Sequence, residues 1–160
     1  MTPVSAASAN LVRAVLIPIT GAQLLLPATC IAEVVNYTSP QPRDPAPPWF
    51  QGQLAWRGEI IPVVAMEHLL GSSLVPPGHR SRIVVCNALG ETPGLDYIGI
   101  LARALPRLVQ VTPDNISPRK DGEGPPPGIL AEAEVAGEPT LILDLDSIEA
   151  KLIELLELED

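Results

Sequence analysis

The sequence predicts a mainly β protein, built as small barrels or as a sandwich. Short runs of β-branched and apolar residues, roughly nine or ten in number, recur at turn-spaced intervals between glycines, prolines and aspartates. Helical periodicity is clear only near the C-terminus. Apolar residues make up 46% of the 160 residues and charged residues 18%, which favours a folded chain over a disordered one. This length suits one domain or two small lobes.

The first third of the chain predicts a hairpin and a connector. Residues 11–20 and 22–28 are apolar runs on either side of Gly21, as in two strands joined by a turn. Residues 29–37 combine one helical turn with a β-branched pair. Residues 39–48 contain five prolines and predict a stiff extended connector.

A second hairpin is predicted from residues 51–57 and 60–65, with its turn at Arg57-Gly58-Glu59. A short helical turn over 66–70 should follow and end at Gly71. The proline-containing segment after it suits a surface link, so we expect two lobes to meet near 72–80. Strands may be exchanged between the lobes, since sequence alone does not show which strands pair.

The second half predicts further strands and one helix. The strand signals lie at 81–89, 95–102, 107–111, 129–135 and 139–146. Asp146 is expected to cap a C-terminal helix over about 147–158, with Glu149 at capping-box spacing. An apolar stripe on this helix consists of Ile148, Leu152, Leu155 and Leu156. Residues 1–10 are expected to be a flexible N-terminus.

The charge distribution excludes several classes of partner. The formal net charge is −9, and residues 121–160 hold 12 acidic groups against one lysine. Nucleic acid and anionic lipid need clusters of Lys and Arg, which are absent, so we expect neither. The apolar N-terminal region is interrupted by Pro18, Gly21, Gln23 and Pro27, which predicts neither a signal peptide nor direct membrane insertion. A cytoplasmic protein is expected.

The sequence offers little for catalysis or metal binding. His68 and His79 have no Cys or His at ligand spacing, and no phosphate-binding loop or nucleophile elbow occurs, so we predict no metal, no cofactor and no enzyme. Asp144 and Asp146 could form a carboxylate pair on one strand face, but solvation and capping explain them better. An active site would need this pair to converge with Glu33 and a histidine.

The cysteines and tryptophans have both structural and functional interpretations. Cys30 and Cys86 are interpreted as free buried thiols, with a disulfide or metal pair as the alternative. Trp49 is expected in the core. Trp56 stands beside Arg57 at a tight turn, and exposed Trp and Arg are enriched in binding hot spots. The alternatives are a core role for Trp56 and a surface ion pair between Arg57 and Glu59.

These motifs together resemble the CheW-like chemosensory coupling domain family, over nearly the whole chain from Leu11 to about Leu156. The most specific stretch is "GQLAWRGEIIPVVAMEHLLG", where Gly52, Arg57, Gly58, Ile60, Ile61, Pro62, Val63, Leu69, Leu70 and Gly71 stand in the family's places. Upstream, "IAEVV" puts Glu33 in the family's acidic position. Downstream, "GILARALPRLVQVTPDNISP" and "LILDLDSI" are similar to the strands of the second lobe and the close into a terminal helix.

The resemblance implies a fold and a function. The fold would be a single CheW-like domain over residues 11–160, with two intertwined SH3-like five-stranded β-barrel lobes and a short C-terminal helix. The function would be that of a non-catalytic adaptor between the cytoplasmic tip of a chemoreceptor and the regulatory domain of a histidine kinase, at membrane-associated receptor arrays. Glu33, Gly52, Trp56, Arg57 and Gly58 would form the partner-binding surface.

The chain departs from the family pattern at two places in that stretch. Ala55-Trp56 stands where members commonly have Asn-Leu, and Ala65-Met66 stands where they have Asp-Leu. These changes suggest a divergent or accessory member, serving a pilus-type motility system instead of flagellar chemotaxis. An alternative function is an SH3-like scaffold that binds a different regulator or peptide without coupling to receptors.

Overall fold

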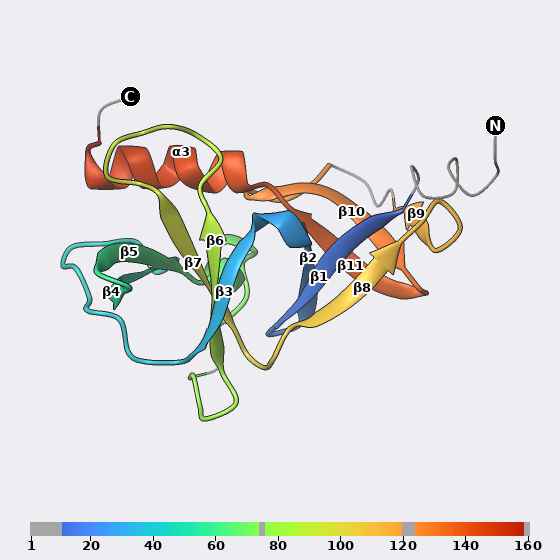
Figure 1. Ribbon diagram of the computed structural model, residues 1–160, viewed down its shortest axis with the longest axis horizontal. Helices are drawn as coiled ribbons and strands as arrows, with labels where there is room; N and C mark the ends of the chain where they lie inside the picture. Colours follow the sequence, from blue (N-terminus) through green and yellow to red (C-terminus); the bar gives the residue numbers. More distant parts are fainter. Residues whose placement is uncertain (1–10, 74–75, 120–123, 159–160) are drawn as a thin grey trace.

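The structure, a computed structural model, describes residues 11–73, 76–119 and 124–158 (Figure 1). Strands β1 to β5 span Val12–Ile19, Ala22–Pro27, Ile31–Asn36, Phe50–Trp56 and Glu59–Val64. Strands β6 to β11 span Arg82–Asn87, Tyr97–Ala102, Arg107–Val111, Ile116–Pro118, Ile129–Val135 and Glu138–Leu143. The helical elements are the 3-10 turn η1 (Ala28–Cys30) and the α-helices α2 (Met66–Leu69) and α3 (Leu145–Leu156). The predicted flexible terminus at residues 1–10 lies outside the described residues.

Six strands form the first lobe, in the order β8-β1-β2-β11-β10-β9. The outermost strands β8 and β9 are joined by only the four residues 112–115, so the sheet has to curl to bring its edges together. Asn115 fixes this turn: its side chain donates to the carbonyl of Gln110 at 2.7 Å and accepts from the N–H of Thr112 at 2.8 Å. The pair β2 and β11 is parallel, with partners Leu24–Leu141 and Leu25–Ile142.

Five strands form the second lobe, in the order β3-β6-β7-β5-β4. Both predicted N-terminal hairpins are present: β1–β2 turns at Gly21 in the first lobe and β4–β5 turns at Arg57-Gly58 in the second. The connector after β3 is held to β4 by a backbone pair between Gln41 and Gln53, with N···O distances of 2.7 and 2.9 Å. The mainly β fold of two curled sheets and a C-terminal helix confirms the predicted fold class, with six strands in one lobe instead of five.

The chain changes sheets at two places that the sequence did not indicate. It passes from the first lobe to the second through η1, and returns through residues 103–106 between β7 and β8. The link predicted near 72–80 is different: its described part lies between α2 and β6, inside the second lobe. Proline and glycine mark it as a loop, but composition does not distinguish a loop within a lobe from one between lobes.

The described residues form three apolar clusters, and each has a distinct place. Ala14, Leu16, Leu25, Val111 and Val135 fill the first lobe, and Ile61, Val63, Ile83 and Val85 fill the second. The opposite faces of both sheets meet in the largest cluster, which also includes Ile148 and Leu152 of α3. Successive residues of a strand point to opposite faces of its sheet. A central strand therefore contributes side chains both to the interior of its lobe and to the layer between the lobes.

Helix α3 lies above the second lobe in Figure 1, and its N-terminal end adjoins the first lobe. It begins two residues before the predicted start, and its N-cap is Asp144, whose Oδ1 accepts from the N–H of Ser147 at 3.2 Å. Asp146 was therefore the wrong cap, since it lies in the first turn. Glu149 makes no capping box; it is buried and binds the loop after β6. The predicted stripe is confirmed in Ile148 and Leu152, which are fully buried.

Candidate functional site

The turn between β4 and β5 presents Arg57 to solvent. Trp56 pairs with Glu59 across the turn, and the two residues between them, Arg57 and Gly58, have φ angles of 47° and 77°. Two consecutive left-handed residues form the tight hairpin turn that follows the twist of the strands, and glycine favours this conformation. The Arg57 side chain is 68% exposed as a result.

Glu33 of β3 reaches this turn from the opposite edge of the second lobe. Its Oε1 accepts from Trp56 Nε1 at 2.9 Å and from Arg57 Nε at 3.0 Å. The hydrogen bond from Arg57, followed by the one from Trp56, lowers the pKa of the Glu33 carboxyl below its ordinary value. Since β3 and β4 are the two outer strands of this sheet, Glu33 links its open edges.

Trp56 combines the two roles that the sequence left open. Its ring packs edge-on against Tyr97, with centroids 4.8 Å apart, and contributes to the second-lobe cluster. The guanidinium of Arg57 lies over the same ring, 5.4 Å from its centroid, in cation–π contact. Trp56 is half-buried, so its ring packs against the Arg57 guanidinium and is still partly exposed to solvent. Arg57 pairs with Glu33, and not with Glu59 as the alternative had it.

A surface hollow of about 400 Å³ lies beside this group, lined by Ala32, Trp56, Arg57, Glu59, Asn87 and Tyr97. Asn87 and Tyr97 were missed by sequence reasoning. They pair across β6 and β7 and come beside the turn only through the sheet order, which local patterns do not report. The aromatic character of Tyr97 was the only available signal.

Gly52 does not join the other predicted site residues. It is buried, with a φ of 128°, at an irregularity in the β4–β5 register between Phe50 and Gly52. A Cβ atom there would collide with the carbonyl oxygen of Gln41. Gly52 thus allows the proline-rich connector to lie against β4. The structure brings together Glu33, Trp56, Arg57 and Gly58.

The remaining candidate groups are dispersed. His68 is half-buried in α2 and His79 is exposed in a loop, while Asp144 caps α3 and Asp146 is exposed. Within residues 11–73, 76–119 and 124–158, no three His, Cys, Asp or Glu side chains are grouped to hold a metal ion.

Both cysteines are free thiols. Burial raises the pKa of Cys30, and it raises that of Cys86, together with the nearby Cys30 charge, to about 12. Thiols with raised pKa values are poor nucleophiles and poor metal ligands at neutral pH. None of the described helices is long and apolar enough to cross a membrane.

Comparisons with known proteins agree with one another. The CheW-like domain family matches residues 13–151. A curated chemotaxis protein CheW of Rhizobium meliloti (strain 1021) is 27% identical over 120 residues, which cover 74% of each chain. The crystal structure of the scaffolding protein TtCheW from Thermoanaerobacter tengcongensis superposes with a TM-score of 0.69 and 19% identity, over 83% of this chain and 88% of that one. At 19% identity, the match to TtCheW shows a similarity of fold alone.

Proposed function

The chain belongs to the CheW-like domain family, and we propose from this that it is a non-catalytic adaptor that couples the tip of a chemoreceptor to the regulatory domain of a histidine kinase. The family is one of scaffolds, and a curated relative bears a chemotaxis name. The adaptor would work in the cytoplasm, at receptor arrays beside the membrane.

The observation that carries the proposal is the group of Glu33, Trp56 and Arg57 at the β4–β5 turn. An exposed arginine braced by a carboxylate and an indole ring is held in one orientation before a partner arrives, which lowers the entropy lost on binding. Arg57 uses Nε on Glu33, so its terminal nitrogens can donate to a partner. Fixed charges of this kind contribute orientation and specificity more than raw affinity.

An SH3-like scaffold for a different regulator is the second candidate. Two observations favour it: the indole N–H of Trp56 is already used on Glu33, and α3 packs Ile148 and Leu152 into the apolar layer between the lobes. Such a scaffold would keep the fold and the Arg57 turn but bind only one of the two partners, or neither.

The adaptor role is tested by assembly of three components. The purified chain is mixed with the regulatory domain of a chemosensory kinase and with a coiled-coil receptor-tip fragment from the same cell, singly and together. The adaptor account predicts micromolar-class binding to each and a ternary complex on size-exclusion chromatography. Binding to one partner alone would favour the scaffold, and binding to neither would contradict the proposal.

A further inference from the structure

A second surface of the molecule, where the first lobe meets the loop before β6 of the second, has the features of a binding groove. The groove has a volume of about 840 Å³ and lies where the β1–β2 turn faces β11. One wall comes from the loop before β6 and from the link between β7 and β8. β2 and β11 pair at Leu24–Leu141 and Leu25–Ile142, and the groove lies beside the first residues of both strands. The groove shares no lining residue with the Glu33–Arg57 group.

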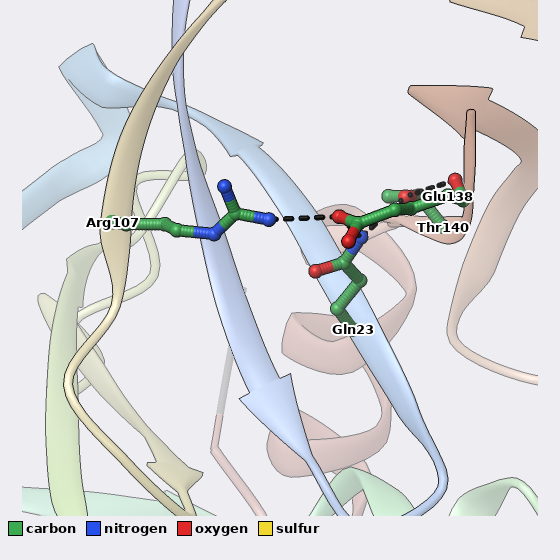
Figure 2. Close-up of polar contacts among 4 residues, drawn as sticks. All are labelled: Gln23, Arg107, Glu138 and Thr140. Carbon is green, nitrogen blue, oxygen red and sulfur yellow. Dashed lines mark hydrogen bonds and ion pairs between the residues drawn. The ribbon is translucent and has the colours of Figure 1, made fainter. Parts of the chain in front are cut away.

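Part of the groove lining is apolar, and another part belongs to a polar network. The half-buried Ala22 and Leu141 supply aliphatic surface, while Ile19, which also lines the groove, is almost fully buried. Figure 2 shows the network, in which Glu138 accepts from Arg107 at 2.8 Å and from Gln23 at 3.2 Å. Thr140 accepts from Gln23 at 3.0 Å. Glu138 therefore has its charge balanced by Arg107.

Two guanidinium groups on the groove wall have no such partner. Arg80 and Arg103 both line the groove, and among the described residues neither side chain has a hydrogen bond or an ion pair. Their backbones are nevertheless anchored. The N–H of Arg103 donates to Pro18 at 2.9 Å, and the carbonyl of Arg80 accepts from Arg82 at 2.9 Å. The backbone is fixed at both positions, and the exposed guanidinium groups have no internal counter-charge among the described residues.

The charge of the groove is opposite to that of the protein as a whole. Arg80, Arg103 and Arg119 line it against Glu132 and the neutralised Glu138, on a chain whose net charge is −9. A ligand of complementary chemistry carries carboxylates for the arginines and an aliphatic side chain for the apolar part of the lining. The global negative charge disfavours a nucleic acid or an anionic membrane, whose charge is spread over a large surface.

We propose that this groove binds an extended acidic segment of a partner protein, with carboxylates on Arg80 and Arg103 and an apolar side chain against Ala22 and Leu141. Arginine suits this role because its planar fork binds carboxylates through paired hydrogen bonds. The site goes beyond the adaptor role and is independent of it, since it shares no residue with the Glu33–Arg57 group.

The test uses a fluorescein-labelled heptapeptide in which glutamate or aspartate alternates with leucine. Fluorescence anisotropy measures its binding to the full chain, to the double variant R80E/R103E and to R43E, which makes one reversal of the same kind on an exposed arginine outside the groove. We expect the double variant to weaken binding by about tenfold or more and R43E by less than about twofold. Raising the salt concentration should weaken binding of the wild type.

Circular dichroism checks that each variant is folded. Titration of the double variant with the regulatory domain of the kinase separates this site from the adaptor surface. R80E/R103E should bind the kinase domain as the wild type does. Several results would overturn the proposal: equal binding to the double variant, equal binding of the Gln/Asn version of the peptide, or tighter binding of a single-stranded DNA oligonucleotide or a phosphatidylserine vesicle. Self-association that the double variant abolishes would place a second copy of this chain in the groove, and would also overturn it.

Discussion

At the scale of single residues, the candidate site depends on one carboxylate. Glu33 holds both Trp56 and Arg57 through the same oxygen, across the open edge of the second lobe. A carboxylate with two donors is stabilised in its charged form, which is the physical cause of its lowered pKa. The stability that these bonds give must therefore depend on pH.

Glu33→Gln should reduce stability at neutral pH and lose its effect in acid. Because the folded-state pKa is lowered, the contribution of the charged carboxylate is complete above the ordinary Glu pKa of about 4.3 and disappears as pH falls through the folded value. Denaturant unfolding of wild type and variant across this range measures the difference. A gap in stability that stays constant from neutral pH to strong acid would contradict the assignment.

Gly52→Ala should destabilise the protein by about 2 kcal/mol or more, because it combines left-handed strain with a collision against Gln41. Gly21→Ala is the matched control: its φ of 82° is strained too, but nothing lies within 4 Å of the added Cβ. The control should cost about 1 kcal/mol. Urea denaturation gives both values, and equal losses would show that the close approach of Gln41 is unimportant.

At the scale of elements, α3 is attached to the second lobe by a buried carboxylate. Glu149 is 5% exposed and accepts from the N–H groups of Leu89 and Gly90 at 2.6 and 2.9 Å. The loop after β6 has these two backbone donors pointing at one side chain, so the helix and the loop fix each other. An apolar stripe alone would orient the helix but would leave those donors unsatisfied.

Glu149→Ala should cost about 2 kcal/mol, since it leaves partly buried donors without an acceptor. Glu154→Ala, on the exposed side of the same helix, should change stability by no more than about 0.5 kcal/mol. Hydrogen exchange supplies a second readout: the amides of Leu89 and Gly90 should lose protection in the first variant alone. Unchanged protection of these amides would contradict the role given to Glu149.

Sequence reasoning succeeded for elements whose signals are local. Gly21 and Arg57-Gly58 marked both hairpin turns, because turn chemistry is written in adjacent residues. It failed for Asp146, since the strand ends at Leu143, earlier than the alternating pattern suggested. It also failed for Gly52, whose need for glycine comes from Gln41 in a different segment. The contact of Glu33 with Trp56 joins the two outer strands of a sheet, and no local pattern reports that.

At the scale of the whole molecule, the lobes are not independent units. The first lobe takes strands from both ends of the chain, while the second is inserted between them. Both sheets and α3 share the largest apolar cluster, so neither lobe has a complete core without the other. The predicted lobe boundary near residues 72–80 was wrong, because a boundary there would divide the strands of the second lobe into two groups.

The shared core predicts a single cooperative unfolding transition. Trp49 and Trp56 belong to the second-lobe region, so their fluorescence reports mainly on that lobe, whereas far-ultraviolet circular dichroism reports on both. The two probes should give coincident denaturation curves. Leu152→Ala, which opens a cavity in the shared layer, should shift both curves together by about 2–5 kcal/mol. Separate transitions would show that the lobes fold independently.

We propose that the Arg57 turn is the surface that binds the kinase. Titration calorimetry of the chain with the regulatory domain of a chemosensory kinase from the same cell tests it most directly, with Arg57→Ala and Trp56→Ala set against the exposed-arginine control Arg43→Ala. The account predicts that the two turn variants remain folded and bind about tenfold more weakly or not at all, while the control binds as wild type. Wild-type affinity in a folded Arg57→Ala variant would contradict the account.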